Sequence, residues 1–387
     1  MRPSRPKIFF LATVEFAVNA FLLSHLKALS KCFDVTVIVN TDDPLFLTKQ
    51  GVDVKVIPLS ISRNTRILSD VYCLIRLVYI FIKLRPSAVH SITPKAGLLA
   101  MLAGFIACVP FRVHTFTGQV WATSNGLKRV VLKFFDWLTA RLATFNIIDS
   151  PSQQQFLINQ KVLTKERSIV FGMGSVSGVD LKRFKPSKKV LTEVRHELGI
   201  SEDAFVFIYL GRLNKDKGIL DLARAFTSLK NKNTYLLVVG PDEGDFVEEM
   251  KRLCGGSVDR LRFVAYTRTP ERFLAASNAL CLPSYREGFG SVVIEAAAMG
   301  LPAIVSDIYG ISDAIVDKGT GLLHPPGDAE CIKRCMDLFL ARPDKLERFG
   351  CEARSRAVKN FDAERITEFW LGFYEQQLQA NPIDKRH

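Results

Sequence analysis

Two glutamates separated by seven residues, Glu287 and Glu295, occupy the stretch whose residue types and spacing are best suited to chemistry. An apolar run over residues 279–282 predicts a buried strand, and residues 291–299 predict a helix. With a further strand expected over 303–306, these elements form a βαβ unit, whose loop lies where open α/β sheets bind ligands. The loop amides and the helix N-terminus favour an anionic or hydroxyl-rich ligand. Charge placement alone fits equally well if Glu287 only complements the helix dipole and Glu295 is solvated.

A second stretch combines cations with glycines directly after an expected strand. The strand is predicted over 205–211 and a helix over 220–229, and the loop between them carries Arg212 and Lys217 and ends at Gly218. An arginine binds phosphate oxygens through two N–H groups at once and a lysine adds a point charge, so the pair suits a diphosphate. The same residues also fit an ordinary charged turn.

Residues 283–307 read P-S-Y-R-E-G-F-G-S-V-V-I-E-A-A-A-M-G-L-P-A-I-V-S-D and resemble the paired-glutamate signature of the retaining family-4 glycosyltransferases. The resemblance implies that Glu287 contacts the hydroxyls of the donor sugar and that Glu295 holds the nucleotide ribose. Residues 211–218 are similar to the family's G-R-x-x-x-x-K-G diphosphate motif, which implies catalytic roles for Arg212 and Lys217 together with Glu287. The implied donor site consists of Arg212, Lys217, Tyr266, Glu287, Gly288, Phe289, Gly290, Ser291 and Glu295.

Other segments extend the resemblance, which is strong over 168–328. Residues 175–184 read S-V-S-G-V-D-L-K-R-F and are similar to the family's crossover between domains, with Ser177 where asparagine is usual. The glycines at 172–178 lack the spacing and the helix of a dinucleotide fingerprint, so a Rossmann cofactor site is rejected. Tyr266 stands where the family places residues near the base, and both stacking on uracil and a place in the core remain open for it.

The N-terminal half departs from the family pattern. Its first loop lacks the usual paired glycines, and the usual His-Gly reads Thr117-Gly118. His114 lies three residues too early to inherit the family's histidine, and a lone histidine at a strand end is more often structural. Lys95 follows another expected strand and is a candidate for an acceptor phosphate. The predicted acceptor or sugar contacts are Glu15, Asn19, Lys95, His114, Thr117, Gly118 and Gln119.

The resemblance implies an α/β fold of the GT-B architecture, with two Rossmann-like, doubly wound domains that face each other across a cleft. The acceptor domain is expected over 1–180 and the nucleotide-sugar domain over 181–361, with a helix at about 362–387 packed back onto the first. At 387 residues the chain is long enough for two domains. Such enzymes need no metal and no other cofactor, because cations and helix dipoles stabilise the departing diphosphate. The absence of a D-x-D triplet agrees with this expectation.

Buried runs and amphipathic stretches predict the element order β-α-β-β-α-β-α-β-α-β in the first domain, which indicates a largely parallel sheet. Strands are expected there over 8–12, 35–40, 54–58, 88–90, 113–116 and 145–149, and helices over 18–29, 68–84, 97–108 and 127–142. In the second domain, further strands are expected over 235–240 and 261–264 and further helices over 191–198 and 268–277.

Charge and cysteine usage limit the class of protein. The net charge is +13, and residues 1–185 hold 24 Lys and Arg against 10 Asp and Glu, so the excess positive charge lies in the N-terminal half. Such a half favours phosphates, nucleic acid or an anionic membrane surface. The eight cysteines form no C-x-x-C pair. They indicate reduced residues of a cytosolic protein, neither a disulfide framework nor a zinc site.

The segment over 127–142 is the expected membrane contact. It combines basic and apolar side chains in the manner of helices that lie on anionic lipid. Packing of its aromatic residues on the domain core is the alternative. No apolar run reaches the roughly 20 residues of a spanning helix, and no signal-peptide cleavage site is clear. The residues concerned are Lys128, Arg129, Lys133 and Arg141 with Leu132, Phe134, Phe135, Trp137 and Leu138, and further charge comes from Arg63, Arg66, Arg76, Lys83 and Arg85.

The combined prediction is a retaining glycosyltransferase, peripheral on the cytosolic face of a membrane. It moves a sugar from a nucleotide sugar, UDP-hexose or UDP-N-acetylhexosamine, to a lipid-linked saccharide in surface polysaccharide or glycan assembly. Nucleic acid is not an expected partner. Two alternatives remain open: a nucleotide-sugar 2-epimerase on the same fold, and a non-catalytic module that binds lipid or nucleic acid.

Overall fold

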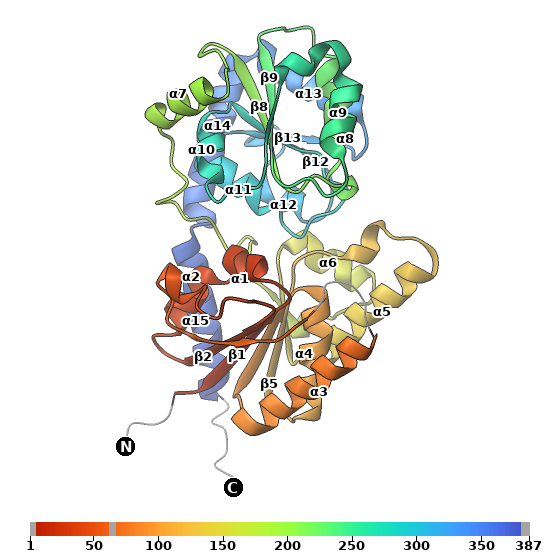
Figure 1. Cartoon of the computed structure of the whole chain (residues 1–387), viewed down its shortest axis with the longest axis vertical. Helices are drawn as coiled ribbons and strands as arrows, with labels where there is room; N and C mark the ends of the chain where they lie inside the picture. Colours follow the sequence, from red (N-terminus) through yellow and green to blue (C-terminus); the bar gives the residue numbers. More distant parts are fainter. Residues whose placement is uncertain (1–4, 62–66, 381–387) are drawn as a thin grey trace. The chain divides into compact units, whose positions relative to one another are not determined.

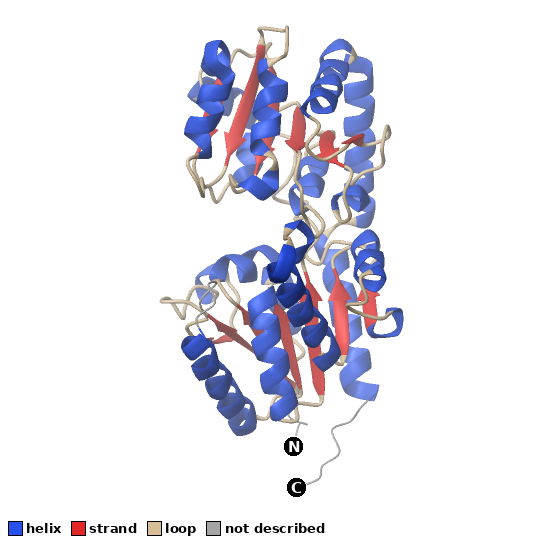
Figure 2. Cartoon of the chain, turned by 90° about the vertical axis from the view of Figure 1, so that its right-hand side faces the viewer, coloured by secondary structure: helices blue, strands red, loops and turns tan. Residues whose placement is uncertain are grey.

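The computed structural model describes residues 5–61 and 67–380, and it divides the chain into two compact units (Figure 1). Unit 1 comprises residues 1–177 and 363–387, and unit 2 comprises residues 178–362. The predicted boundary between 180 and 181 lies close to the observed one between 177 and 178. Helices flank the strands in each unit (Figure 2), which is the layering of a doubly wound α/β domain.

In its described residues, unit 1 holds a seven-stranded parallel sheet in the order β3-β2-β1-β4-β5-β6-β7. The strand order reverses between β1 and β4, so ligands are expected at the carboxyl edge beside these strands. The strands are β1 (Lys7–Ala12), β2 (Asp34–Val39), β3 (Lys55–Pro58), β4 (Ala88–Ile92), β5 (Phe111–Phe116), β6 (Phe145–Ile148) and β7 (Ser168–Val170). The α-helices are α1 (Glu15–Phe21), α2 (Leu23–Leu29), α3 (Ile67–Leu84), α4 (Pro94–Ile106), α5 (Gly126–Leu142), α6 (Pro151–Asn159) and α15 (Ala363–Ala380).

The last helix, α15, packs against α2 in unit 1 (Figure 1). Its Trp370 indole is stacked between the imidazoles of His25 and His90, at centroid distances of 4.6 and 4.8 Å. His25 is bonded to Thr367 Oγ1 at 2.9 Å and to Val176 O at 2.7 Å. Burial lowers the pKa of His25 to about 4 and the pKa of His90 well below its usual value, so both rings are neutral at neutral pH. This packing fastens α15 to unit 1.

Unit 2, which is described throughout, holds a six-stranded parallel sheet in the order β10-β9-β8-β11-β12-β13. Its strands are β8 (Phe205–Leu210), β9 (Thr234–Val239), β10 (Leu261–Val264), β11 (Ala279–Leu282), β12 (Ala303–Ser306) and β13 (Gly321–His324). Its α-helices are α7 (Lys188–Glu197), α8 (Ile219–Thr227), α9 (Phe246–Cys254), α10 (Pro270–Ala275), α11 (Ser291–Ala298), α12 (Ile311–Ala314), α13 (Ala329–Ala341) and α14 (Pro343–Asn360).

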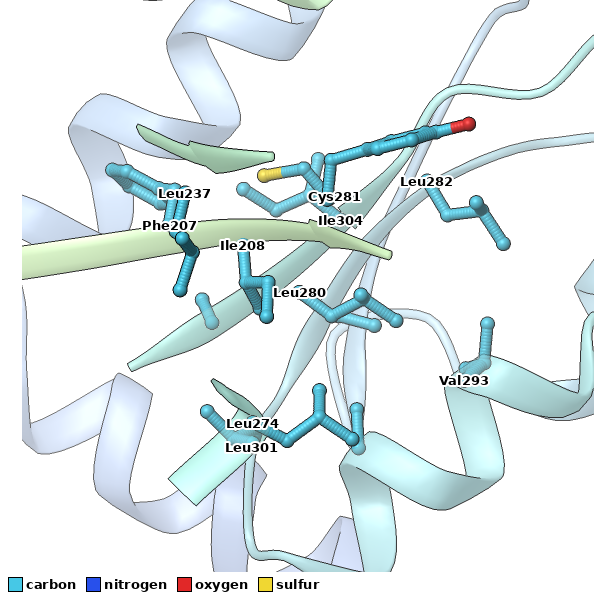
Figure 3. Packing of buried hydrophobic residues seen from close by; sticks show 14 of the residues in the cluster. Phe207, Ile208, Leu237, Leu274, Leu280, Cys281, Leu282, Val293, Leu301 and Ile304 are labelled. Atoms are coloured by element: carbon cyan, nitrogen blue, oxygen red, sulfur yellow. The ribbon is translucent and has the colours of Figure 1, made fainter. Parts of the chain in front are cut away.

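The core of unit 2 fixes the two strands that precede the predicted donor loops. Figure 3 shows Ile208 of β8 and Leu280 of β11 in one buried cluster, which also contains Val293 of α11. Parallel strands buried on both faces need continuous apolar runs, and β8 and β11 have them. The carboxyl ends of β8 and β11 are therefore held side by side.

The structure differs from the predicted elements in a few places. The helix expected over 18–29 is two helices, α1 and α2, which meet at Leu22, and α1 already begins at Glu15. The sequence patterns do not predict α6, β7 or α9. The first is largely polar, the second has three residues, and α9 buries only Met250 and Cys254. By contrast, β10, β11 and β12 have the predicted bounds.

Candidate functional site

The loops after β8 and β11 meet at the carboxyl edge of the unit 2 sheet, because these strands are neighbours. Lys217 Nζ forms an ion pair with Glu287 Oε1, and their side chains are 17% and 13% exposed. Ser284 Oγ donates a hydrogen bond to the same oxygen at 3.0 Å. Within the described residues, the other carboxylate oxygen of Glu287 accepts no hydrogen bond. That oxygen is suited to the hydroxyl groups of a ligand.

Backbone contacts hold the same two loops together. Gly218 has a φ of +63°, and a Cβ there would lie 2.0 Å from the carbonyl oxygen of Pro283, so the close approach requires glycine. The backbone N–H of Tyr285 donates to Asp216 O at 2.8 Å. Arg286 Nη2 and Asp216 Oδ2 form an ion pair at 2.8 Å. The relative position of Lys217 and Glu287 is thus set by the backbone as well as by their own contact.

Arg212 lies in the same neighbourhood. The hydroxyl of Tyr209 donates to Arg212 O at 2.6 Å. Burial raises the pKa of Tyr209 well above its usual value, the carboxylate of Glu287 raises it further, and Arg212 lowers it. Arg212 follows β8 and Glu287 follows β11, and these strands are paired, so both residues lie in loops at the carboxyl edge of the unit 2 sheet. The arrangement combines two cations with a carboxylate, as a diphosphate attached to a hydroxyl-rich group requires.

Glu295 lies one turn inside α11, where burial raises its pKa to about 7. Arg183 lowers this pKa and Glu271 raises it, and these two residues form an ion pair at 2.7 Å. Tyr266, in the loop after β10, is 58% exposed, so the interpretation of Tyr266 as a core residue is wrong. Its ring is accessible for stacking.

The remaining predicted donor residues surround the start of α11. Phe289 is 1% exposed and packs edge-on against Phe361 with a centroid distance of 5.3 Å, so its ring belongs to the core. Gly290 caps α11 with a φ of +79°, and Ser291 is the first helical residue. Gly288 also needs a close neighbour without a side chain, because a Cβ at Gly310 would lie 2.3 Å from the Gly288 oxygen.

In unit 1, three predicted acceptor contacts are held by other side chains. Thr41 donates a hydrogen bond to Glu15, which is in the first turn of α1 and not in a loop. Asn19 Oδ1 accepts a hydrogen bond from Gln50 at 3.0 Å. Lys95 forms an ion pair with Asp70 at 2.6 Å.

The other predicted acceptor contacts lie on and after β5. His114 is 2% exposed, its Nδ1 lies 2.9 Å from Ser91 Oγ, and burial lowers its pKa to about 3. A Cβ at Gly97 would lie 2.4 Å from its ring, so α4 covers His114. His114 is thus enclosed by protein atoms, and its contact with the acceptor or the sugar stays a prediction.

Thr117 and Gly118 are partly buried, and Gln119 is fully buried. Gln119 Oε1 accepts a hydrogen bond from Gln153 Nε2 at 3.3 Å, while its own Nε2 has no partner among the described residues. Within the described residues, no hydrogen bond or ion pair joins any two of the predicted acceptor contacts. The ion pair between Lys217 and Glu287 therefore has no counterpart among the predicted acceptor contacts.

Two helices of unit 1 carry large apolar side chains on their outer faces. On α5, the exposed residues recur at helical spacing, and Phe134 and Trp137 are 51% and 41% exposed. The interpretation that the α5 aromatics pack on the core is therefore wrong for these two. The outward apolar residues of α5 are Leu127, Val130, Val131, Phe134, Phe135 and Trp137, and those of α3 are Ile67, Leu68, Val71, Tyr72, Ile75, Tyr79 and Ile82.

The charged side chains of α3 and α5 also differ in the direction they face. Arg129 and Lys133 lie over the Trp121 ring, at 5.3 and 5.6 Å from its centroid, so these two predicted lipid contacts point inward. Trp121 Nε1 donates to Asp136 at 2.7 Å, and burial raises the pKa of Asp136 to about 7. Asp70, the acidic residue of α3, is paired with a lysine. The exposed charges of both helices are basic: Arg76, Lys83, Lys128 and Arg141. Arg85 is exposed just after α3, and Arg63 and Arg66 lie outside the described residues.

The structure adds Glu243 and Asn214 to the predicted donor site. Arg212 Nη1 lies 2.9 and 2.7 Å from the two carboxylate oxygens of Glu243, and Asn214 Nδ2 lies 2.9 Å from one of them. The sequence signal for Glu243 is an acidic turn directly after a strand, at the edge where Arg212 also lies.

The described residues hold neither a cluster of metal ligands nor a helix that could span a membrane. No group of three His, Cys, Asp or Glu side chains is arranged to hold a metal ion. None of the helices combines the length and the apolar composition that crossing a bilayer takes.

Comparison with known proteins identifies relatives over the whole chain. Residues 191–356 match the model of the family "Glycosyl transferases group 1". The capsular polysaccharide biosynthesis glycosyltransferase CapM of Staphylococcus aureus is 30% identical over 378 residues, which cover 97% of this chain and 98% of CapM. The UDP-Gal:alpha-D-GlcNAc-diphosphoundecaprenol alpha-1,3-galactosyltransferase of Escherichia coli is 27% identical over 307 residues, which cover 77% of this chain and 78% of that protein.

Among solved structures, Anabaena Alr3699/HepE in complex with UDP and glucose has a TM-score of 0.81 at 20% identity, over 95% of this chain and 99% of that one. This likeness and the two parallel sheets confirm the predicted GT-B fold. The predicted resemblance to family-4 glycosyltransferases is confirmed by the nearly full-length match to CapM. The chain belongs to the glycosyl transferases group 1 family and is a bacterial glycosyltransferase of the polysaccharide-biosynthesis type.

Proposed function

We propose that the protein transfers a sugar from a UDP-sugar to a lipid-linked saccharide, with retention of the anomeric configuration, during assembly of a surface polysaccharide or glycan. The observation that carries the proposal is the Lys217–Glu287 ion pair, formed where the loop after β8, which also carries Arg212, meets the loop after β11. Two similar proteins support the proposed identity of the donor and of the acceptor. HepE is solved with UDP and glucose, and the Escherichia coli relative is named for a diphosphoundecaprenol-linked sugar. The donor is UDP-hexose or UDP-N-acetylhexosamine.

In the proposed reaction, the acceptor hydroxyl forms a bond to the anomeric carbon while the bond from that carbon to the UDP oxygen breaks. Attack on the face that the diphosphate leaves retains the configuration. The acceptor proton passes to the departing diphosphate. Arg212 and Lys217 stabilise the negative charge that develops on UDP, and Glu287 orients the sugar through its hydroxyls. No metal or other cofactor takes part in this scheme.

A ligand screen followed by a turnover assay tests the proposal. Ligands that bind the folded state raise its apparent stability, so UDP and UDP-sugars are expected to raise the melting temperature more than GDP, ADP and their sugars. Incubation with the UDP-sugar alone separates transfer from 2-epimerisation, because an epimerase converts the donor without an acceptor. Stabilisation by none of the three nucleotide classes would favour the non-catalytic module.

Glu295 makes donor affinity depend on pH. Two ribose hydroxyls need an ionised carboxylate as acceptor, and the pKa of Glu295 is about 7. UDP is therefore expected to bind about tenfold more weakly at pH 6 than at pH 8, because a group with this pKa is mostly neutral at the lower value. Calorimetric titration of the wild type and of Glu295→Gln measures the effect.

The stability of the unliganded protein should change in the opposite direction. The pKa of Glu295 is raised in the folded state, so this residue contributes more stability below its ordinary pKa, and that contribution is lost as pH rises through about 7. In Glu295→Gln, both dependences should flatten. An equally steep UDP profile in this variant would exclude Glu295 as the titrating group.

We also propose an anionic membrane surface as the partner of α3 and α5, on the cytosolic face. The outward side chains of these helices are apolar, and their exposed charges are basic. This combination is typical of helices that lie in the lipid interface. It also suits an enzyme whose acceptor is anchored in lipid.

Serine substitutions on α5 test the membrane proposal. Phe134→Ser with Trp137→Ser should weaken flotation with phosphatidylglycerol vesicles at least tenfold, since each partly inserted aromatic contributes about 1–2 kcal/mol. The matched control is Val358→Ser on α14, a residue that is 48% exposed in unit 2. Equal flotation of the double variant and the control, or no preference for phosphatidylglycerol over phosphatidylcholine at low salt, would overturn the proposal.

A further inference from the structure

The loops after β8 and β9 are joined along their backbones. Leu213 N–H donates to Pro241 O at 2.8 Å, and Glu243 N–H donates back to Leu213 O at 3.0 Å. Gly240 lies so close to the first loop that a Cβ there would be 1.9 Å from the Gly211 oxygen. The two loops are therefore joined by backbone contacts, which help to set the position of Glu243 relative to Arg212.

A second set of contacts shapes the turn that carries Glu243. The carboxylate of Asp242 accepts backbone hydrogen bonds from Gly244, Phe246 and Val247, at 3.1, 3.0 and 3.0 Å. These bonds fold the turn tightly against the start of α9. Glu243 consequently projects from a turn that is held by several hydrogen bonds. Its contact with Arg212 is therefore supported by the structure around it.

The Glu243 contact uses one end of the guanidinium. Both carboxylate oxygens of Glu243 accept from Nη1 of Arg212, at 2.9 and 2.7 Å. Within the described residues, Nε and Nη2 of Arg212 donate to no protein atom, and the side chain is 44% exposed. The Nε–Nη2 edge is the one with which an arginine donates two parallel hydrogen bonds to a phosphate.

We propose that Glu243 is a positioning residue for donor binding: it holds Arg212 by Nη1, so that the Nε–Nη2 edge is presented to the diphosphate. This inference rests on the proposed function, because it takes the donor diphosphate as the ligand of Arg212. Asn214 completes the arrangement, since its Nδ2 donates to Glu243 at 2.9 Å and fixes the carboxylate. An arginine held in advance loses less rotamer freedom when the diphosphate binds.

Glu243 could also have the opposite effect, which is to weaken donor binding. A carboxylate beside a diphosphate repels it, and in that case Glu243 would compete with the donor for Arg212. The geometry favours positioning, because Glu243 occupies Nη1 alone and leaves the other edge of the guanidinium unoccupied by protein atoms within the described residues. The two roles predict opposite signs for the effect of removing the charge.

Titration calorimetry with UDP, and with GDP and ADP in parallel, tests the proposal on the whole protein. Glu243→Ala is expected to weaken UDP binding about tenfold, and Glu243→Gln about threefold, because the amide oxygen still accepts from Nη1. Neither change should add to the loss caused by Arg212→Ala in a double variant, since Glu243 acts through Arg212. The matched control is Glu248→Ala on α9, which removes an ion pair with Lys251 of 2.7 Å.

The binding measurements distinguish a failure of the positioning role of Glu243 from a failure of the proposed glycosyl transfer. UDP binding by Glu243→Gln that is as tight as wild type or tighter overturns positioning. So does a loss in Glu243→Ala that is repeated in full on the Arg212→Ala background, because that loss would come from the turn itself. If the wild type binds none of the three nucleoside diphosphates, the proposed function fails together with the inference.

Discussion

Replacing Lys217 with alanine should reduce turnover by about 10²–10³-fold and should also weaken UDP binding. Lys217 is expected to stabilise the charge that develops on the leaving diphosphate, and removal of one preorganised donor of this kind typically costs about 3–4 kcal/mol. The side chain is largely buried beside Glu287, so solvent screens its charge poorly. The measurements are initial rates with the donor identified in the screen and the affinity for UDP.

The matched control for this variant is Lys215→Ala. Lys215 is exposed in the same short helical turn, η4 (Lys215–Lys217), and no ion pair in the described residues involves it. Lys217→Ala also leaves Glu287 partly buried without its cation, which destabilises the fold. Melting curves of Lys217→Ala and of Lys217→Ala with Glu287→Ala separate this effect from catalysis. Turnover in Lys217→Ala equal to that in Lys215→Ala would contradict the assigned diphosphate contact.

The meeting of Lys217 with Glu287 could be predicted from the sequence because each residue lies in a compact motif. Each cation or carboxylate follows an apolar strand by a few residues, and β8 and β11 are adjacent, so the motifs meet at one edge. Glu243 could not be assigned in the same way. Its acidic turn lies outside the two motifs, and its contact with Arg212, 31 residues earlier, depends on how the loops after β8 and β9 pack together.

Unit 1 was less predictable, for a related reason. Periodicity shows that α5 has an apolar stripe and basic residues, but it does not show which of these face the protein. Arg129 and Lys133 turn inward to Trp121, while Phe134 turns outward. His114 is similar: its residue type suggests chemistry, and only the packing shows that α4 covers its ring. In both cases, packing between elements determines which side chains are buried. The spacing of residues within one element does not show this.

Replacing Glu287 with glutamine should lower turnover by at least about 100-fold, with UDP affinity changed less than twofold. Glutamine keeps the size of the side chain and an oxygen for Ser284 and Lys217, but it replaces the second carboxylate oxygen with an amide donor. Hydrogen bonds from sugar hydroxyls to that oxygen are charge-assisted, and they are lost in the variant. Because the diphosphate contacts of Arg212 and Lys217 remain, the nucleotide should still bind.

This split between binding and turnover distinguishes Glu287 from both cations. Lys217→Ala should lose both properties, whereas Glu287→Gln should lose the transfer step alone. The matched control is Glu197→Gln, which changes the charge of a carboxylate that is 52% exposed and paired with Arg272. If Glu287→Gln binds UDP normally and transfers sugar at the rate of Glu197→Gln, Glu287 does not orient the donor sugar. The ion pair with Lys217 would then serve only to hold the two loops of unit 2 together, because that contact needs no sugar.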